Sequence, residues 1–150
     1  KEYNIDHYIE AAERPDLAFT WENLYLSCKE CNSKVPNKTL PNAATLDPCS
    51  HAYLHEEHLA FDDEQIRSRN GSQLGLKTIQ KYSLNRDDLL LRRIRALRQF
   101  DMRLSIFRKH IISQGRTALS ENEKEILRSF QQAEHSFSLM FAYYISQQEL

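Results

Sequence analysis

The sequence predicts an α+β fold, with a small N-terminal part of short strands and a short helix followed by a mainly α-helical C-terminal part. Two observations carry this prediction. Short apolar and aromatic stretches, separated by prolines, fill the first part of the chain, whereas apolar residues recur at steps of three and four from Leu90 onward. We therefore expect two domains, residues 1–70 and residues 71–150.

The first elements are short. Residues 3–9 are rich in Tyr and Ile and predict a strand. Pro15 marks a loop, and residues 18–26 supply the apolar side chains of a second extended segment. A short helix within residues 28–34 must end before Pro36, because proline disfavours helical backbone in the residue that precedes it.

The segment of residues 35–62 is expected to be irregular, since three prolines interrupt it. A β-hairpin is expected from Leu59 to Arg69, closed near Asn70-Gly71.

Two long amphipathic helices are expected in the C-terminal part. The first has Asn85 as its N-cap and ends near Gly115; its apolar face comprises Leu90, Ile94, Leu97, Phe100, Leu104, Phe107 and Ile111. The second begins at the capping-box pattern of residues 120–123; its apolar face comprises Ile126, Phe130, Ala133, Phe137, Met140 and Tyr144. Helices joined by so short a turn should pack as an antiparallel pair.

Charge is distributed unevenly along the chain. Residues 1–62 hold 5 Lys/Arg and 11 Asp/Glu, whereas residues 63–150 hold 15 and 10. This distribution is consistent with a metal site in the acidic part and an anion-binding surface on the basic part. Ordinary surface charge, unevenly spread, would also explain it. No apolar run approaches the roughly 20 residues that span a bilayer, and no signal-peptide pattern follows Lys1, so we expect a cytoplasmic protein that does not enter membranes.

Residues 6–34 carry the chemistry that suggests a function. Hydrolysis of a phosphodiester needs an activated water and neutralisation of phosphate charge, which a histidine base and a divalent cation with oxygen ligands can supply. Asp6 and His7 are adjacent, and adjacent residues of a strand point to opposite sides, so both reach one site only where the strand ends or bends. Asn32, about 25 residues later, could present an oxygen to the same ion.

The order Asp6-His7, Asn23-Leu24 and Cys28-x-x-Cys31-Asn32-x-Lys34 resembles the HNH motif of ββα-metal nucleases. The resemblance implies a ββα-metal HNH core within residues 1–70. It further implies that His7 is the general base, Asp6 a Mg²⁺ or Mn²⁺ ligand, Asn23 a brace for the loop, and Asn32 the second metal ligand in place of the usual histidine. Lys34 and Lys38 are expected to contact the substrate phosphate.

Longer segments are similar to the PtuB-like HNH proteins of Septu-type and retron-linked anti-phage systems. These segments are residues 5–8, 19–28, 47–48 and 58–61. The resemblance implies a nucleic-acid substrate, DNA more than RNA, and an ABC-type ATPase partner (PtuA-like), with a retron reverse transcriptase and its RNA/DNA as further partners. The helical domain of residues 71–150 would then dock a partner, contact nucleic acid, or both.

The cysteines allow more than one arrangement. A CxxC pair, Cys28 and Cys31, in a chain with no secretory signal favours a metal or redox role over a disulfide scaffold. PtuB-like proteins are expected to hold a structural zinc with two CxxC pairs, so the second pair would lie upstream of Lys1. Otherwise Cys49 or His51 completes the site, or no zinc binds, because a structural zinc needs four ligands.

Other features have more than one interpretation. His51, His55 and His58 could form a second metal site, but structural or surface roles are favoured, with His58 the strongest structural candidate. A basic run on the first long helix could bind phosphates, face an acidic partner, or simply be solvated; it comprises Arg92, Arg93, Arg95, Arg98, Arg103, Arg108 and Lys109.

Two alternatives to a nuclease remain. One is a non-catalytic, zinc-stabilised adaptor that keeps the HNH fold and docks a partner through its helices. The other is a thiol-redox module, which would need a thioredoxin-like βαβ context that the sequence does not suggest.

Overall fold

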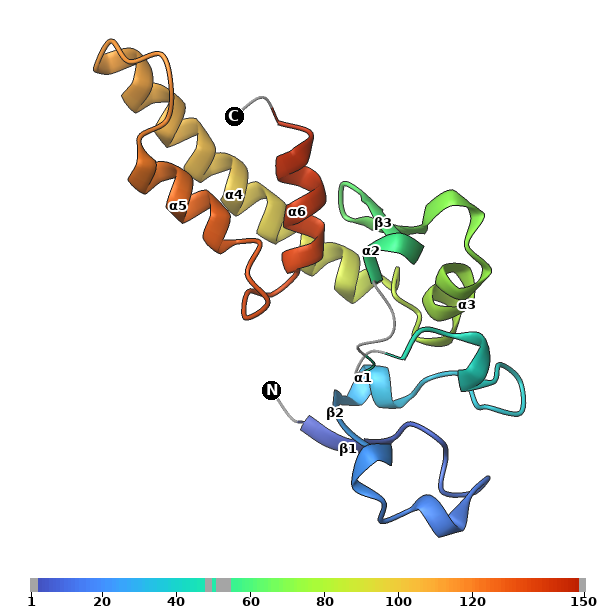
Figure 1. The fold of residues 1–150 in the computed structure, drawn as a ribbon. Helices are drawn as coiled ribbons and strands as arrows, with labels where there is room; N and C mark the ends of the chain where they lie inside the picture. Colours follow the sequence, from blue (N-terminus) through green and yellow to red (C-terminus); the bar gives the residue numbers. More distant parts are fainter. Residues whose placement is uncertain (1–2, 48–49, 51–54, 149–150) are drawn as a thin grey trace. The chain divides into compact units, whose positions relative to one another are not determined.

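The computed structural model describes residues 3–47, 50 and 55–148. The described chain forms two compact units, one from residues 1–59 with 66–85 and the other from residues 60–65 with 86–150. Small two-stranded sheets in the first half, and one long helix with two shorter ones in the second, confirm the predicted α+β class (Figure 1).

The N-terminal unit begins with an antiparallel pair of strands. Strand β1 (Tyr3–His7) pairs with β2 (Leu24–Cys28), and His7 lies opposite Leu24. The connecting loop holds two 3-10 turns, and α1 (Lys29–Asn32) follows β2 directly. The predicted strand, loop and short helix are therefore confirmed. Of the extended segment predicted for residues 18–26, only Leu24–Leu26 belong to a strand, because Trp21–Asn23 form a 3-10 turn.

Two further short helices belong to this unit. The helices are α2 (His55–His58) and α3 (Gln73–Lys81). Strands β3 (Leu59–Asp62) and β4 (Gln65–Ser68) form the second two-stranded sheet.

The hairpin turn differs from the expected position. It lies at Asp63–Glu64, where Asp63 takes a φ of 49°. The Asn70-Gly71 pair also has positive φ, at 50° and 71°, but this turn joins β4 to α3. The prediction was wrong because two turn signals lie in this stretch, and the stronger Asn-Gly signal is the one that serves the helix start.

The C-terminal unit is built on α4 (Asp87–Ser113). Its predicted apolar face supplies most of the core; the buried cluster comprises Leu97, Phe100, Leu104, Phe107, Leu127, Met140 and Phe141. Gly115, at φ 63°, ends the helix as expected, with its N–H donated to the carbonyl of Ile112 in a Schellman-type cap. No helix among the described residues is long and apolar enough to cross a membrane.

Asn85 is not the N-cap of α4, which is Arg86. The Asn85 side chain instead pairs with the backbone of Ile66, accepting from its N–H at 2.9 Å and donating to its carbonyl at 2.8 Å. An amide side chain can imitate a strand in this way, and that long-range pairing outweighs the local cap.

The second long helix is a wrong prediction, since the structure has α5 (Glu121–Ser129) and α6 (Ser138–Ser146) with a left-handed Phe137 between them. In one continuous helix Leu127 and Met140 would point about 140° apart. Both are buried in the same core, at 3% and 0% exposure. The break rotates the later segment so that both residues pack on α4.

The start of α5 gives a pH prediction. Ser120 and Glu123 form the expected capping box, and Arg116 contacts both Glu123 oxygens at 2.8 and 3.0 Å. Arg116, with the Ser120 N–H, lowers the pKa of Glu123 from its ordinary 4.5 to about 2. A depressed carboxyl pKa stabilises the fold above pH 4.5, and that contribution is lost as the pH falls toward 2. We expect the melting temperature to fall more steeply across this window in the wild type than in Glu123→Gln.

The measurement is thermal unfolding by circular dichroism from pH 6 to pH 2. Glu125→Gln, an exposed carboxylate of the same helix, is the matched control and should follow the wild-type pH dependence. A Glu123→Gln curve parallel to the wild type would contradict this assignment.

Candidate active site

A pocket of ≈ 300 Å³ lies where β1 ends. It brings together Asp6 and His7 from the end of β1 and Asn32 from the end of α1, residues that the sequence placed about 25 positions apart. Its lining comprises Asp6, His7, Glu10, Ala11, Asn32, Lys34 and Pro36. Because His7 is the last residue of its strand, it and Asp6 can face one pocket, as expected from the alternation of side chains.

The His7 ring is oriented by the loop that follows β1. Its Nε2 lies 2.9 Å from the carbonyl oxygen of Ala18. A carbonyl can only accept a hydrogen bond, so Nε2 carries the proton and Nδ1 keeps a lone pair in the neutral ring. This tautomer leaves one ring nitrogen able to accept a proton.

Asn23 holds that loop in place. It is 5% exposed, its Oδ1 accepts from the N–H of Ile9 at 2.7 Å, and its Nδ2 donates to the carbonyls of Ile9 and Leu17 at 3.0 and 3.1 Å. Ile9 and Leu17 lie at opposite ends of the segment that leads to Ala18. The side chain therefore fixes the carbonyl that orients His7.

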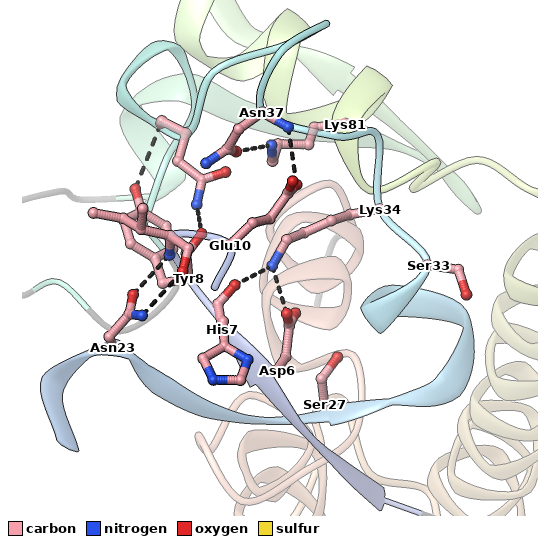
Figure 2. Close-up of polar contacts among 12 residues, drawn as sticks. Asp6, His7, Tyr8, Glu10, Asn23, Ser27, Ser33, Lys34, Asn37 and Lys81 are labelled. Atoms are coloured by element: carbon pink, nitrogen blue, oxygen red, sulfur yellow. Dashed lines mark hydrogen bonds and ion pairs between the residues drawn. The ribbon is translucent and has the colours of Figure 1, made fainter. Parts of the chain in front are cut away.

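Asp6 is buried and paired with Lys34. The Lys34 Nζ lies 2.5 Å from Asp6 Oδ1 and donates to the His7 carbonyl at 2.7 Å (Figure 2). The two side chains are only 4% and 11% exposed, so this is an ion pair largely removed from solvent. Lys38 is exposed and is not among the residues that line the pocket.

The oxygen atoms of this pocket fit a hard divalent cation. Asp6 offers a carboxylate and Asn32 an amide oxygen, the donors that Mg²⁺ and Mn²⁺ prefer. No group of three His, Cys, Asp or Glu able to hold a metal occurs among the described residues. An ion here would depend on water and phosphate oxygens for its remaining ligands, as Mg²⁺ commonly does.

The cysteine pair lies in a second pocket, of ≈ 370 Å³. Cys28 and Cys31 are not joined to each other by a disulfide, and both line this pocket with His55 and Tyr82. Burial raises the pKa of Tyr82 far above its usual value, so its hydroxyl stays neutral there. Within the described positions the four ligands of a structural zinc are not present. Cys49 and His51 lie outside the described residues.

Some residues that shape the pocket were missed in the sequence. A chain of hydrogen bonds next to the pocket connects Lys81 to Asn37 and Asn37 to Glu10 (Figure 2). From the sequence, a lysine near the end of an amphipathic helix, such as Lys81, is expected to be exposed to solvent. Its burial follows only from tertiary contacts. His58 contacts the N-cap serine of α3 at 2.8 Å, in keeping with its structural interpretation.

Comparison with known proteins gives the same family as the motif. Residues 1–38 match the family model described as HNH endonuclease. Septu protein PtuB of Bacillus mycoides (strain KBAB4) is 28% identical over 105 residues, which cover 58% of this chain and 35% of the relative. The chain thus spans about a third of the length of that relative. No solved structure matches.

The family match covers the strand pair, Asn23, the cysteine pair and all the residues that line the pocket, the last of which is Pro36. The N-terminal segment of this chain is thus similar to HNH endonucleases, and the longer match makes the chain similar to a PtuB protein.

Proposed function

We propose that this chain is a metal-dependent HNH endonuclease that hydrolyses phosphodiester bonds in nucleic acid, with DNA the preferred substrate. The observation that supports it best is the shared pocket of Asp6, His7 and Asn32, in which His7 is oriented by the Ala18 carbonyl. The HNH family match over the same residues supports it independently.

Each pocket residue has a role in this proposal. His7 takes the proton from the attacking water at Nδ1, while its Nε2–H stays bonded to Ala18. Asp6 and Asn32 hold a Mg²⁺ or Mn²⁺ ion, which supplies charge neutralisation at the phosphate and the leaving oxygen. Asn23 keeps the orienting loop rigid, and Lys34, held at the pocket wall, with Lys38 on the neighbouring loop, contacts the phosphate.

The test is cleavage of circular DNA, linear DNA and RNA by the purified chain, alone and in the complex isolated from cells. We expect cleavage with Mg²⁺ or Mn²⁺, none with a chelator, and faster cleavage of DNA than of RNA. A non-catalytic adaptor would leave all three substrates intact and would not bind Mn²⁺ in a way that depends on Asp6.

We further propose that the chain acts in Septu-type anti-phage defence and docks an ABC-type ATPase through its helical unit. The similarity to a Septu protein PtuB supports a role in anti-phage defence. The support from the structure is a second stripe on α4, made of exposed residues on the face opposite its core residues. This outward stripe comprises Leu91, Arg95, Arg98, Met102, Ile106 and Lys109. Apolar side chains interleaved with cations favour an acidic, partly apolar protein surface over nucleic acid alone. A retron reverse transcriptase as partner stays a prediction.

The double charge reversal Arg95→Glu/Arg98→Glu should weaken the ATPase complex by about tenfold or more, because each substitution replaces an attraction by a repulsion. Affinity is measured by biolayer interferometry at two salt concentrations. Arg128→Glu, an exposed arginine of α5, is the control and should bind like the wild type. Equal affinity of all three proteins would remove the outward stripe from the interface.

A further inference from the structure

Lys81, the last residue of α3, is fully buried at 0% exposure. Its Nζ donates to the carbonyl of Val35 at 3.0 Å, to Asn37 Oδ1 at 2.7 Å and to the carbonyl of Leu40 at 2.7 Å. An ammonium group has three N–H donors, and each finds one acceptor here. Because all three of its N–H groups are hydrogen-bonded, this buried ammonium holds its acceptors in fixed positions.

All three acceptors belong to one loop, residues 35–40, which follows Asn32 and Lys34 directly. The Val35 N–H also donates to the Lys81 carbonyl at 2.9 Å, so Val35 and Lys81 are tied in both directions. The loop is thereby fixed to the end of α3 rather than left to solvent.

Asn37 carries the connection to the opposite wall of the catalytic pocket. Its backbone N–H donates to Glu10 Oε1 at 2.9 Å, and its Nδ2 donates to Glu13 Oε2 at 2.7 Å. Glu10 lines the pocket beside His7. Figure 2 shows that hydrogen bonds connect Lys81 to Asn37 and Asn37 to Glu10, next to Lys34.

These contacts join the two walls of the pocket. One wall is the end of β1 with the start of its loop, which carries His7 and Glu10. The other is the segment from Asn32 to Pro36. Burial lowers the pKa of Lys81, and Lys34 adds to that shift while Glu10, Asp6 and Glu13 oppose it, so the charges of both walls act on this one ammonium.

We propose that Lys81 is a positioning residue for the nuclease site: through Asn37 and Glu10 it fixes the distance between the Asn32–Lys34 segment and the Asp6–His7 end of β1. We call this set of three residues the Lys81 clamp. The proposal rests on the proposed function of the pocket. Without the ammonium, the buried Asn37 Oδ1 and the part-buried carbonyls of Val35 and Leu40 lose this donor, and the loop must move to satisfy them. A displacement of about 1 Å in a catalytic group can cost on the order of 100-fold in rate.

The test variant is Lys81→Met, which keeps the apolar stem and removes the three donors. Lys77→Met, one turn earlier on α3, is the matched control. Two quantities are measured: the dissociation constant for Mn²⁺, from the paramagnetic signal of the free ion, and the cleavage rate at saturating Mn²⁺. We expect Mn²⁺ binding and cleavage each to weaken by roughly 10- to 100-fold in Lys81→Met, as for residues that orient metal ligands, and to be unchanged in Lys77→Met.

Asn37→Ala is the second variant, needed because Lys81→Met could fail to fold. This variant loses two hydrogen bonds of the Asn37 side chain, the one to the Lys81 ammonium and the one to Glu13. The bonds from Lys81 to the carbonyls of Val35 and Leu40 remain. We expect a smaller weakening of Mn²⁺ binding, by a few-fold, together with faster hydrogen exchange of the Val35 and Asn37 amides in both variants.

The outcomes separate the clamp from the proposed function. Wild-type Mn²⁺ affinity in the folded fraction of both variants would overturn the positioning role, even if less protein folds. Unchanged hydrogen exchange at Val35 and Asn37 would overturn it too. A wild-type protein that binds no Mn²⁺ and cleaves nothing would instead overturn the proposed function, while the exchange data would still report on the clamp.

Discussion

Replacing His7 by alanine is expected to lower the rate of nucleic-acid cleavage by about 10²- to 10⁴-fold, the usual contribution of a general base. The reason is geometric. His7 lines the pocket with Asp6 and Asn32, and its bond to the Ala18 carbonyl leaves Nδ1 as the acceptor for a proton. Single-turnover cleavage of a labelled duplex at saturating Mn²⁺ measures the effect.

The controls for this variant distinguish catalysis from folding. His110→Ala removes a half-exposed histidine from α4 and should cleave at the wild-type rate. His7→Ala should keep wild-type Mn²⁺ affinity, since the proposed ligands are Asp6 and Asn32. If His7→Ala cleaves as fast as the wild type, the base has been assigned to the wrong residue.

Replacing Asp6 by asparagine has two consequences. We expect cleavage to be lost, because Asp6 is the proposed carboxylate ligand. We also expect the protein to become less stable by about 3 kcal/mol, because Lys34 is left as a buried charge without its counter-ion. The second effect follows from the 2.5 Å contact of Asp6 with Lys34 and the 4% exposure of the Lys34 side chain. Urea unfolding measures the stability, and the cleavage assay measures the activity.

A second substitution separates these two effects. In Asp6→Asn/Lys34→Met no unpaired charge remains, so most of the lost stability should return while cleavage stays absent. Return of cleavage in the double variant would show that cleavage needs neither the Asp6 carboxylate as a metal ligand nor the Lys34 ammonium at the phosphate. An additive loss of stability would show that the ion pair carries little coupling energy.

The sequence was sufficient where local chemistry decides the structure. Asp6-His7 at the end of a short strand, the stop before Pro36 and the capping box at Ser120 depend on neighbours within a few residues, and the structure has all three. The motif order also placed Asn32 in the same pocket as His7.

Where contacts between distant residues determine the structure, the prediction from the sequence was wrong or missing. The uninterrupted apolar period through Phe130 and Phe137 suggested one helix, but packing of Leu127 and Met140 on α4 requires a break. Asn85 resembled a cap yet pairs with Ile66. Nothing near Lys81 indicates that its ammonium is enclosed by a loop more than 40 residues earlier.

The most direct test of the metal-dependent nuclease site is a titration with paramagnetic Mn²⁺, followed by nuclear magnetic resonance of the ¹⁵N-labelled chain. We predict that the amide signals of Asp6, His7 and Asn32 broaden first, at substoichiometric Mn²⁺, and that Asp6→Asn abolishes this broadening. Broadening that begins at Cys28 and Cys31, or that is the same in Asp6→Asn, would contradict the assignment of the pocket as the catalytic metal site.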